Sequence, residues 1–212
     1  LYKVLLLIRF MYSPGRAKMN KQIIKSDLLG ESYIKVNHKS GLTILLYPMP
    51  SYSGAYATFG TKYGSIDTKF KKSGDKDFTE VPAGIAHFLE HKLFANENGS
   101  DSFERFSELG ADANAYTSIN KTAYLFSATE NFYEALDELI TFVTHPYFSK
   151  ENVASEIGII AEEIKMYDDN PDWQLYFGML EGLFVNNPVK VDIAGTVETI
   201  AEITPDTLFD AY

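Results

Sequence analysis

The 212-residue sequence predicts an α+β fold, in which a mostly antiparallel sheet built from hairpins packs against helices. Its strand-like segments come in neighbouring pairs joined by short polar turns, which is typical of hairpins. Its helical segments are grouped along the second half of the chain instead of alternating with single strands. With 45% apolar and 23% charged residues, the composition is that of a domain able to bury a core.

The first predicted strands lie in the N-terminal third. Tyr33–Asn37 and Leu42–Tyr47 alternate or run apolar on either side of the polar turn 38–41, so they predict a hairpin. Ala55–Tyr63, rich in aromatic and small residues, is the next strand candidate. Residues 67–80 are polar and lysine-rich, and we expect them to form a surface loop.

Two helices are predicted after this loop. Pro82 suits the first turn of a helix, and Ala83–Phe94 has helical apolar spacing. Phe103–Leu109 is a shorter helical segment that should end at Gly110, because glycine readily adopts the left-handed conformation that closes a helix.

A second hairpin and a run of helices complete the chain. Ala113–Ser118 and Thr122–Thr129 predict the hairpin, with Asn120 at its turn. The helices are predicted from apolar residues recurring every three or four positions, and Pro146 sets the end of the first because a helix avoids the residue before a proline. They cover Asn131–Thr144, Ser149–Tyr167, Asp172–Phe184, Thr196–Ile203 and Pro205–Tyr212.

Charge and cysteine content exclude several functions. The net charge is −10 and no cluster of Lys and Arg occurs, so a sequence-independent nucleic-acid binder is excluded. There are no cysteines, hence no disulfides and no thiolate metal sites, and any metal must be held by His, Asp or Glu. Lack of Cys fits a cytoplasmic protein, although export stays open because exported bacterial proteins also avoid Cys. No apolar run is long enough to span a membrane.

His87, Glu90 and His91 form an H-x-x-E-H motif within the predicted helix 83–94. Residues four apart on a helix project from one face, so both imidazoles can reach a single ion. Glu90 lies at the edge of that face, where its carboxylate can accept the proton of a metal-activated water without being a ligand. The motif is the inverted order of H-E-x-x-H. Because catalytic zinc takes three protein ligands and one open position, a third ligand must come from elsewhere.

The predicted helix 149–167 offers candidates for that ligand. Glu156 and Glu163 are seven residues apart, two helical turns, and therefore share a face, whereas Glu162 is rotated about 100° from it. Two carboxylates on one face can have different roles: one binds the metal, and the other orients a histidine ring.

Two interpretations of the motif compete. An H-x-x-E-H sequence on a helix is often only a solvated, salt-bridging face. Here, however, residues 84–94 are largely apolar, so their polar groups would be buried and would need a partner. A bound cation provides that partner, which favours a metal site.

Three segments carry a resemblance to a known family. Gly84–Phe94 matches a G-x-A-H-F-L-E-H signature, Gly110–Ser118 resembles a substrate-side strand, and Glu156–Glu163 with residues 164–171 resembles a third-ligand helix. The family with these features is the insulinase/pitrilysin family of zinc metallopeptidases, the inverzincins. The sequence resembles the N-terminal catalytic domain of a bacterial member, and the similarity covers most of the chain.

The resemblance implies a set of site residues and a mechanism. Zn²⁺ would be held by His87, His91 and Glu163, and it would activate a water and polarise the scissile carbonyl. Glu90 would be the general base that accepts the proton of that water. Glu156 would be an auxiliary acidic residue in the catalytic site.

The resemblance also implies how substrate binds and how the protein is organised. Asn114 and Ala115 would pair an extended peptide with a strand edge. Family members are longer and close related α/β domains around the peptide. Residues 26–212 are therefore expected to form an N-terminal catalytic metallopeptidase domain, truncated at its C-terminus, and residues 1–25 an N-terminal extension or fragment edge. The expected partners are a peptide substrate and either the second half of the full-length chain or a paralogous subunit.

The function predicted from these residues is that of a zinc metalloendopeptidase acting on peptides or small unfolded proteins. The alternative is a non-catalytic or weakly active partner subunit of a paired insulinase-family peptidase, which binds peptides. Such subunits normally lose a ligand or the glutamate base, whereas all four positions are present here. The fragment alone could still bind zinc and lack turnover. A structural zinc site is disfavoured because such sites usually close with four ligands, mostly Cys.

Overall fold

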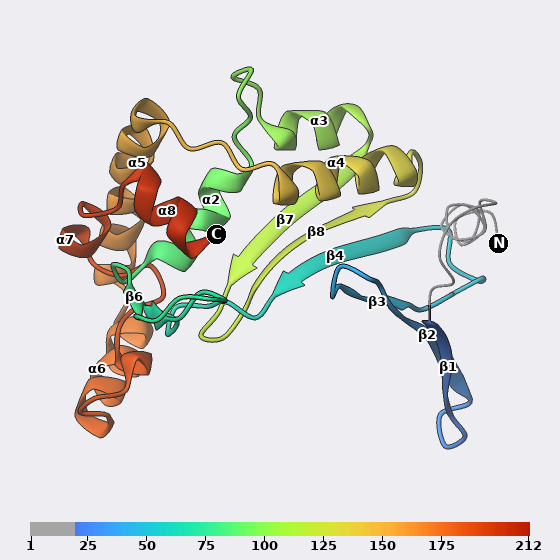
Figure 1. Cartoon of the computed structure of the whole chain (residues 1–212), viewed down its shortest axis with the longest axis horizontal. Coiled ribbons are helices and arrows are strands. Elements are labelled where there is room, and N and C mark those ends of the chain that lie inside the picture. The colour runs from blue at the N-terminus through green and yellow to red at the C-terminus, as the bar shows by residue number, and fades with distance from the viewer. Residues whose placement is uncertain (1–19) are drawn as a thin grey trace. The chain divides into compact units, whose positions relative to one another are not determined.

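The computed structural model describes residues 20–212 (Figure 1). By their contacts these residues belong to two compact units, one ending at Ala55 and the other spanning Tyr56–Tyr212. The sequence predicts an N-terminal extension over residues 1–25. Of these, residues 1–19 lie outside the described residues. Beyond that point Asn20–Ser26 form strand β1, which the sequence did not predict.

The first unit contains a three-stranded antiparallel sheet in the order β1-β2-β3. The predicted hairpin is confirmed as β2 (Glu31–Asn37) and β3 (Thr43–Leu46), with Val36 paired to Ile44. Strand β1 was missed because Ile23 and Ile24 are adjacent and all but its last residue are exposed, so the sequence shows no alternation of apolar and polar residues.

The second unit is built on a three-stranded sheet in the order β4-β8-β7. Its strands are β4 (Ala55–Thr61), β7 (Ala111–Thr117) and β8 (Thr122–Ala128), and the predicted hairpin is confirmed as β7 and β8. The segment expected to be a loop over residues 67–80 contains a short antiparallel ribbon, β5 (Lys69–Phe70) and β6 (Thr79–Glu80). Backbone pairing forms this ribbon, although its composition is that of a loop.

The helices lie close to their predicted positions. They are α2 (Ile85–Leu93), α3 (Ser102–Glu108), α4 (Phe132–Thr144), α5 (Lys150–Asp168), α6 (Pro171–Leu183), α7 (Val197–Ile200) and α8 (Pro205–Ala211), with a 3-10 turn at Pro188–Lys190. Helix α7 is shorter than expected. Thr204 caps α8 by accepting a hydrogen bond from Thr207 N, and the extended backbone this requires separates the two helices. Within residues 20–212, no helix is both long enough and apolar enough to cross a bilayer.

An aromatic core fixes α2 against the sheet. Phe88 of α2, Phe106 of α3, Phe126 of β8 and Phe142 of α4 are completely or almost completely buried. The rings of Phe106 and Phe126 lie 5.5 Å apart in a tilted arrangement. Helices α2, α3 and α4 contact β7 or β8 (Figure 1), so the motif-bearing helix is held by large, fully buried aromatic side chains.

The start of α2 is held by a close contact between two backbone segments, each of which contains a glycine, Gly84 and Gly195. Gly84 precedes the helix with φ 89°, and a Cβ there would lie 2.3 Å from the carbonyl oxygen of Ala194. Gly195, with φ 76°, would meet the carbonyl oxygen of Ala83 at 2.6 Å in the same way. Only glycine permits this backbone contact, which fixes the entry of α2 against residues 194–195.

Helix α5 packs against α2. Its N-terminus has a capping box, in which Ser149 accepts from the backbone of Asn152 and Asn152 accepts from the backbone of Ser149. Val153 and Ile160 are buried in the core, and Glu156 and Glu163, each three residues further on, lie on the adjacent, partly buried side of the helix. The packing of α2 on α5 brings the histidines and glutamates together.

Candidate metal centre

The two histidines of α2 share one face, as their spacing predicts. The ring centroids of His87 and His91 lie 4.6 Å apart, with an angle of 65° between the ring planes. Both side chains are largely buried, and the Nε2 atom of each faces α5. The helix therefore presents two imidazole nitrogens to a common point.

Glu163 of α5 supplies the third donor. Its carboxylate oxygens lie 3.7 Å from His87 Nε2 and 3.5 Å from His91 Nε2, and the three donor groups lie within 4.8 Å of one another. These distances exceed those of good hydrogen bonds. Two ligand atoms of one tetrahedral zinc ion, each about 2.0–2.1 Å from it, would be separated by about 3.3 Å. The spacing and chemistry of this donor set therefore fit zinc.

Glu162 does not contribute to this group. Its carboxylate accepts a hydrogen bond from Lys165 at 2.7 Å, and its side chain is 76% exposed. Glu162 is rotated about 100° from Glu163 on the helix. It therefore pairs with Lys165 in solvent, whereas Glu163 belongs to the donor group.

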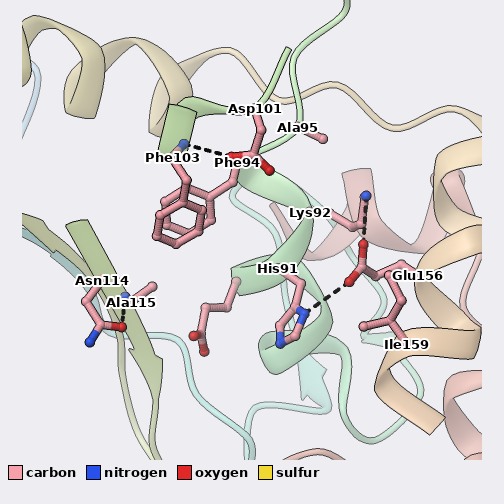
Figure 2. A pocket seen from close by; sticks show the side chains of 11 residues that line it. His91, Lys92, Phe94, Ala95, Asp101, Phe103, Asn114, Ala115, Glu156 and Ile159 are labelled. Atoms are coloured by element: carbon pink, nitrogen blue, oxygen red, sulfur yellow. Dashed lines mark hydrogen bonds and ion pairs between the residues drawn. The ribbon is translucent and has the colours of Figure 1, made fainter. Parts of the chain in front are cut away.

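Glu156 bonds to His91 at Nδ1, the ring nitrogen that does not face Glu163. His91 Nδ1 donates to Glu156 Oε1 at 3.0 Å, and Lys92 Nζ donates to Glu156 Oε2 at 2.9 Å (Figure 2). With the proton on Nδ1, the lone pair of Nε2 is directed toward Glu163. Burial opposes ionisation of Glu156, but the hydrogen bonds from His91 and Lys92 outweigh it and hold its pKa below the usual value.

The two histidines have different electrostatic environments. Burial, followed by the neighbouring His91, lowers the pKa of His87 to about 4, so this imidazole is neutral near pH 7. For His91, burial would lower the pKa, but the hydrogen bond with Glu156 and the surrounding carboxylates raise it overall. The same excess of negative charge around His91 favours a bound cation.

Glu90 lies beside the donors without belonging to them. Its Oε2 accepts a hydrogen bond of 2.5 Å from Thr117 Oγ1 at the end of β7. Burial raises the pKa of Glu90, and the bond from Thr117 offsets part of that shift. One carboxylate oxygen is thereby fixed, and the carboxyl lies on the wall of a pocket.

This pocket, of about 350 Å³, adjoins the metal centre. Figure 2 shows α2, α5 and β7 around it, with the stacked rings of Phe94 and Phe103 on one side. Its lining residues are Glu90, His91, Lys92, Phe94, Ala95, Asp101, Phe103, Asn114, Ala115, Glu156 and Ile159. The predicted catalytic, metal-ligating and substrate residues are therefore brought to one place, except that His87 and Glu163 lie beside the pocket and not in its wall.

Asn114 and Ala115 lie on the outer strand of the sheet as described. Ser118 N donates to Lys121 O, and this pairing makes residue 118 a hydrogen-bonded position of the β7–β8 hairpin. By alternation, the N–H of Ala115 points away from β8. It donates instead to the side-chain oxygen of Asn114, at 2.8 Å. This backbone group is therefore available to an added strand only if Asn114 releases it.

Two residues at the centre were not identified from the sequence. Lys92 is the one lysine of the largely apolar stretch 84–94, which is a local signal of a buried partner. Thr117 has no such signal, because its contact with Glu90 joins residues 27 positions apart and depends on how α2 packs against β7.

An H-x-x-E-H helix packed on a glutamate-bearing helix within an α+β domain defines the inverted-motif class of metallopeptidase domains. Comparison with known proteins specifies the family. The model of the insulinase family (peptidase family M16) matches residues 74–197, and the chain belongs to that family. This confirms the resemblance found from the sequence, and the predicted fold class is confirmed with it.

Among relatives, an uncharacterized zinc protease of Bacillus subtilis, YmfH, is 50% identical and matches 89% of this chain and 44% of its own. The crystal structure of an M16-like peptidase from Alicyclobacillus acidocaldarius is 38% identical, with a TM-score of 0.79 over 93% of this chain and 43% of that one. Pitrilysin, at 21% identity and a TM-score of 0.71 over 90% of this chain and 21% of its own, shares the fold. The chain thus spans less than half the length of these relatives.

Proposed function

We propose that the protein is a zinc-dependent endopeptidase whose metal is held by His87, His91 and Glu163. The observation that carries the proposal is the convergence of these three donor groups within 4.8 Å, beside Glu90 and a pocket. The names of several relatives, which call them zinc proteases, support the same activity.

Each side chain has a definite task in peptide hydrolysis. Zinc bound here would lower the pKa of a water and polarise the scissile carbonyl. Glu90 would accept the proton of that water at its carboxylate and pass it to the leaving amine. Thr117 Oγ1 donates to Oε2 of Glu90 and so orients the carboxylate for this transfer. Glu156 would act on His91 by fixing its Nδ1 proton.

The outer edge of β7 would hold the substrate. An extended peptide added to this edge would accept from the N–H of Ala115, which already faces outward. The Asn114 side chain now bonded to that N–H would then be free to bind the peptide itself. The position of both residues on the pocket wall supports this role.

The alternative, a peptide-binding partner subunit without activity, has less support. Such a subunit needs no intact base, yet Glu90 is present, partly buried and oriented by Thr117.

The remaining length of a longer chain, or a paralogous subunit, would complete the enclosure of the peptide. A cytoplasmic location remains our expectation from the lack of cysteine.

The decisive experiment uses a quenched fluorescent peptide, metal analysis and the variant Glu90→Gln in the intact protein. The wild type should bind zinc and hydrolyse the peptide, and chelation should abolish hydrolysis. Glu90→Gln should retain zinc and lose at least about 100-fold in kcat, because general-base catalysis contributes about 10²–10⁴-fold. Full activity in Glu90→Gln would exclude the proposed role of Glu90.

A further inference from the structure

We propose that Lys92 is a positioning residue that assigns the two glutamates of α5 to different tasks: it holds Glu156 on His91 and leaves Glu163 to bind the metal. The inference rests on the metal site of the proposed function. Lys92 lies outside the H-x-x-E-H motif and is not one of the two glutamates of α5, Glu156 and Glu163.

The first argument is the burial of Lys92. Its side chain is only 7% exposed, and its Nζ lies 2.9 Å from Glu156 Oε2. A buried ammonium group is costly unless it is paired, and Glu156 is the acidic partner that the structure provides. A residue that served only to fill space between α2 and α5 would be apolar at this position.

The second argument is the geometry of the Glu156 carboxylate. Lys92 engages Oε2, and His91 Nδ1 engages Oε1, so both oxygens are occupied on the side away from the metal donors. Figure 2 shows the carboxylate between the two side chains. A carboxylate held at both oxygens cannot turn away from the imidazole, and it therefore fixes the orientation of the His91 ring.

The third argument is competition between the glutamates. Glu156 and Glu163 lie on one face of α5, and both are near His91. Glu163 nevertheless belongs to the group of three donors, and Glu156 does not. Lys92 accounts for this difference, because it pairs with Glu156 and has no bond to Glu163 among the described interactions.

The test is a double-mutant cycle on zinc affinity, measured in the purified protein by competition with a chromophoric chelator. Lys92→Met retains length and apolar packing but removes the donor. It should weaken zinc binding about 10-fold or more, as expected for loss of a partner that orients a ligand. Glu156→Gln should weaken binding to a similar extent. Adding Lys92→Met to Glu156→Gln should then change the affinity less than about threefold, because Lys92 acts through Glu156.

The matched control is Lys165→Met on the exposed side of α5, where Lys165 pairs with Glu162. It should leave zinc affinity unchanged. If Lys92→Met fails to fold, the comparison of Glu156→Gln with Lys92→Met/Glu156→Gln still decides, since the double variant leaves no unpaired charge. Wild-type affinity in folded Lys92→Met, or a further tenfold loss in the double variant, would overturn the proposal. If the wild-type protein binds zinc but does not hydrolyse peptides, the proposed function is wrong, and the inference about Lys92 is still tested by the zinc affinities.

Discussion

At the scale of single residues, the candidate metal centre depends on where each carboxylate lies along and around helix α5. Glu163 faces both histidine Nε2 atoms, whereas Glu162, one residue earlier, bonds to Lys165 in solvent. Glu156, two turns before Glu163, bonds to the opposite nitrogen of His91. Three carboxylates of one helix thus have three environments, because Glu162 is rotated about 100° from Glu163, whereas Glu156 shares the face of Glu163 but lies two turns earlier along the axis.

The first residue-scale prediction separates the adjacent glutamates. Glu163→Gln should lower zinc affinity by at least about 100-fold, because a neutral amide replaces one of only three protein ligands. Glu162→Gln, its matched control, should bind zinc like the wild type. Metal content after dialysis and chelator competition measure both variants. Greater damage from Glu162→Gln would show that the ligand is wrongly assigned.

The second residue-scale prediction concerns Thr117. Thr117→Val keeps the shape of the side chain and removes the hydrogen bond to Glu90. Since hydrogen bonds to charged groups contribute about 1.5–3 kcal/mol, we expect kcat to fall about 10- to 100-fold. KM and zinc content should change little. In a Glu90→Gln background the same substitution should have no further effect on residual activity, and an additional loss there would contradict this role.

At the scale of elements, strand β7 lies beside both Glu90 and the proposed substrate-binding edge. Its inward position Thr117 orients Glu90 on α2, while its outward N–H at Ala115 lies on the edge where a peptide strand would add. In the proposed function, one strand would therefore determine both the position of the base and that of the substrate backbone. The order β4-β8-β7 leaves this edge of β7 unpaired in the described chain.

The element-scale prediction removes one backbone donor from that edge. Ala115→Pro deletes an N–H that does not bond to β8, and proline is tolerated at such edge positions. We expect KM to rise about 3- to 10-fold, the equivalent of one lost hydrogen bond, with zinc content unchanged. Ala115→Ser keeps the N–H and should behave like the wild type. An unchanged KM in a folded Ala115→Pro protein would argue against strand addition at this edge.

At the scale of the whole molecule, the second unit brings together residues from three segments of the chain. His87 and His91 come from α2, Thr117 from β7, and Glu163 from α5. The aromatic core around Phe88 and the glycine contact at Gly84 hold α2, and the buried face with Ile160 holds α5. A metal ion binding across α2 and α5 would therefore stabilise the folded unit as well as serve catalysis.

The whole-molecule prediction follows from that linkage. At a zinc concentration 100 times the Kd, binding adds about 2.7 kcal/mol to the stability, or about 5–10 °C in Tm for a domain of this size. Chelation should lower Tm by this amount in the wild type and in Glu162→Gln. In Glu163→Gln the shift should largely disappear. An equal shift in all three proteins, measured by thermal denaturation, would mean that zinc binds elsewhere.

The sequence alone determined most local features. Apolar spacing located the helices within a few residues, and the four-residue and seven-residue spacings selected His87, His91, Glu156 and Glu163 because helix geometry is regular. The ribbon at residues 69–80 and strand β1 were not found, because backbone pairing with a partner segment forms them and their side chains carry little apolar pattern.

The tertiary structure alone decided what lies opposite each of these side chains. That Glu163 and not Glu156 faces the Nε2 atoms depends on how α5 packs against α2 and on the pairing of Glu156 with Lys92. That Thr117 holds Glu90 depends on the end of β7 meeting α2. Spacing along a helix fixes which residues share a face, but only the packing of helices and strands fixes which residue that face meets.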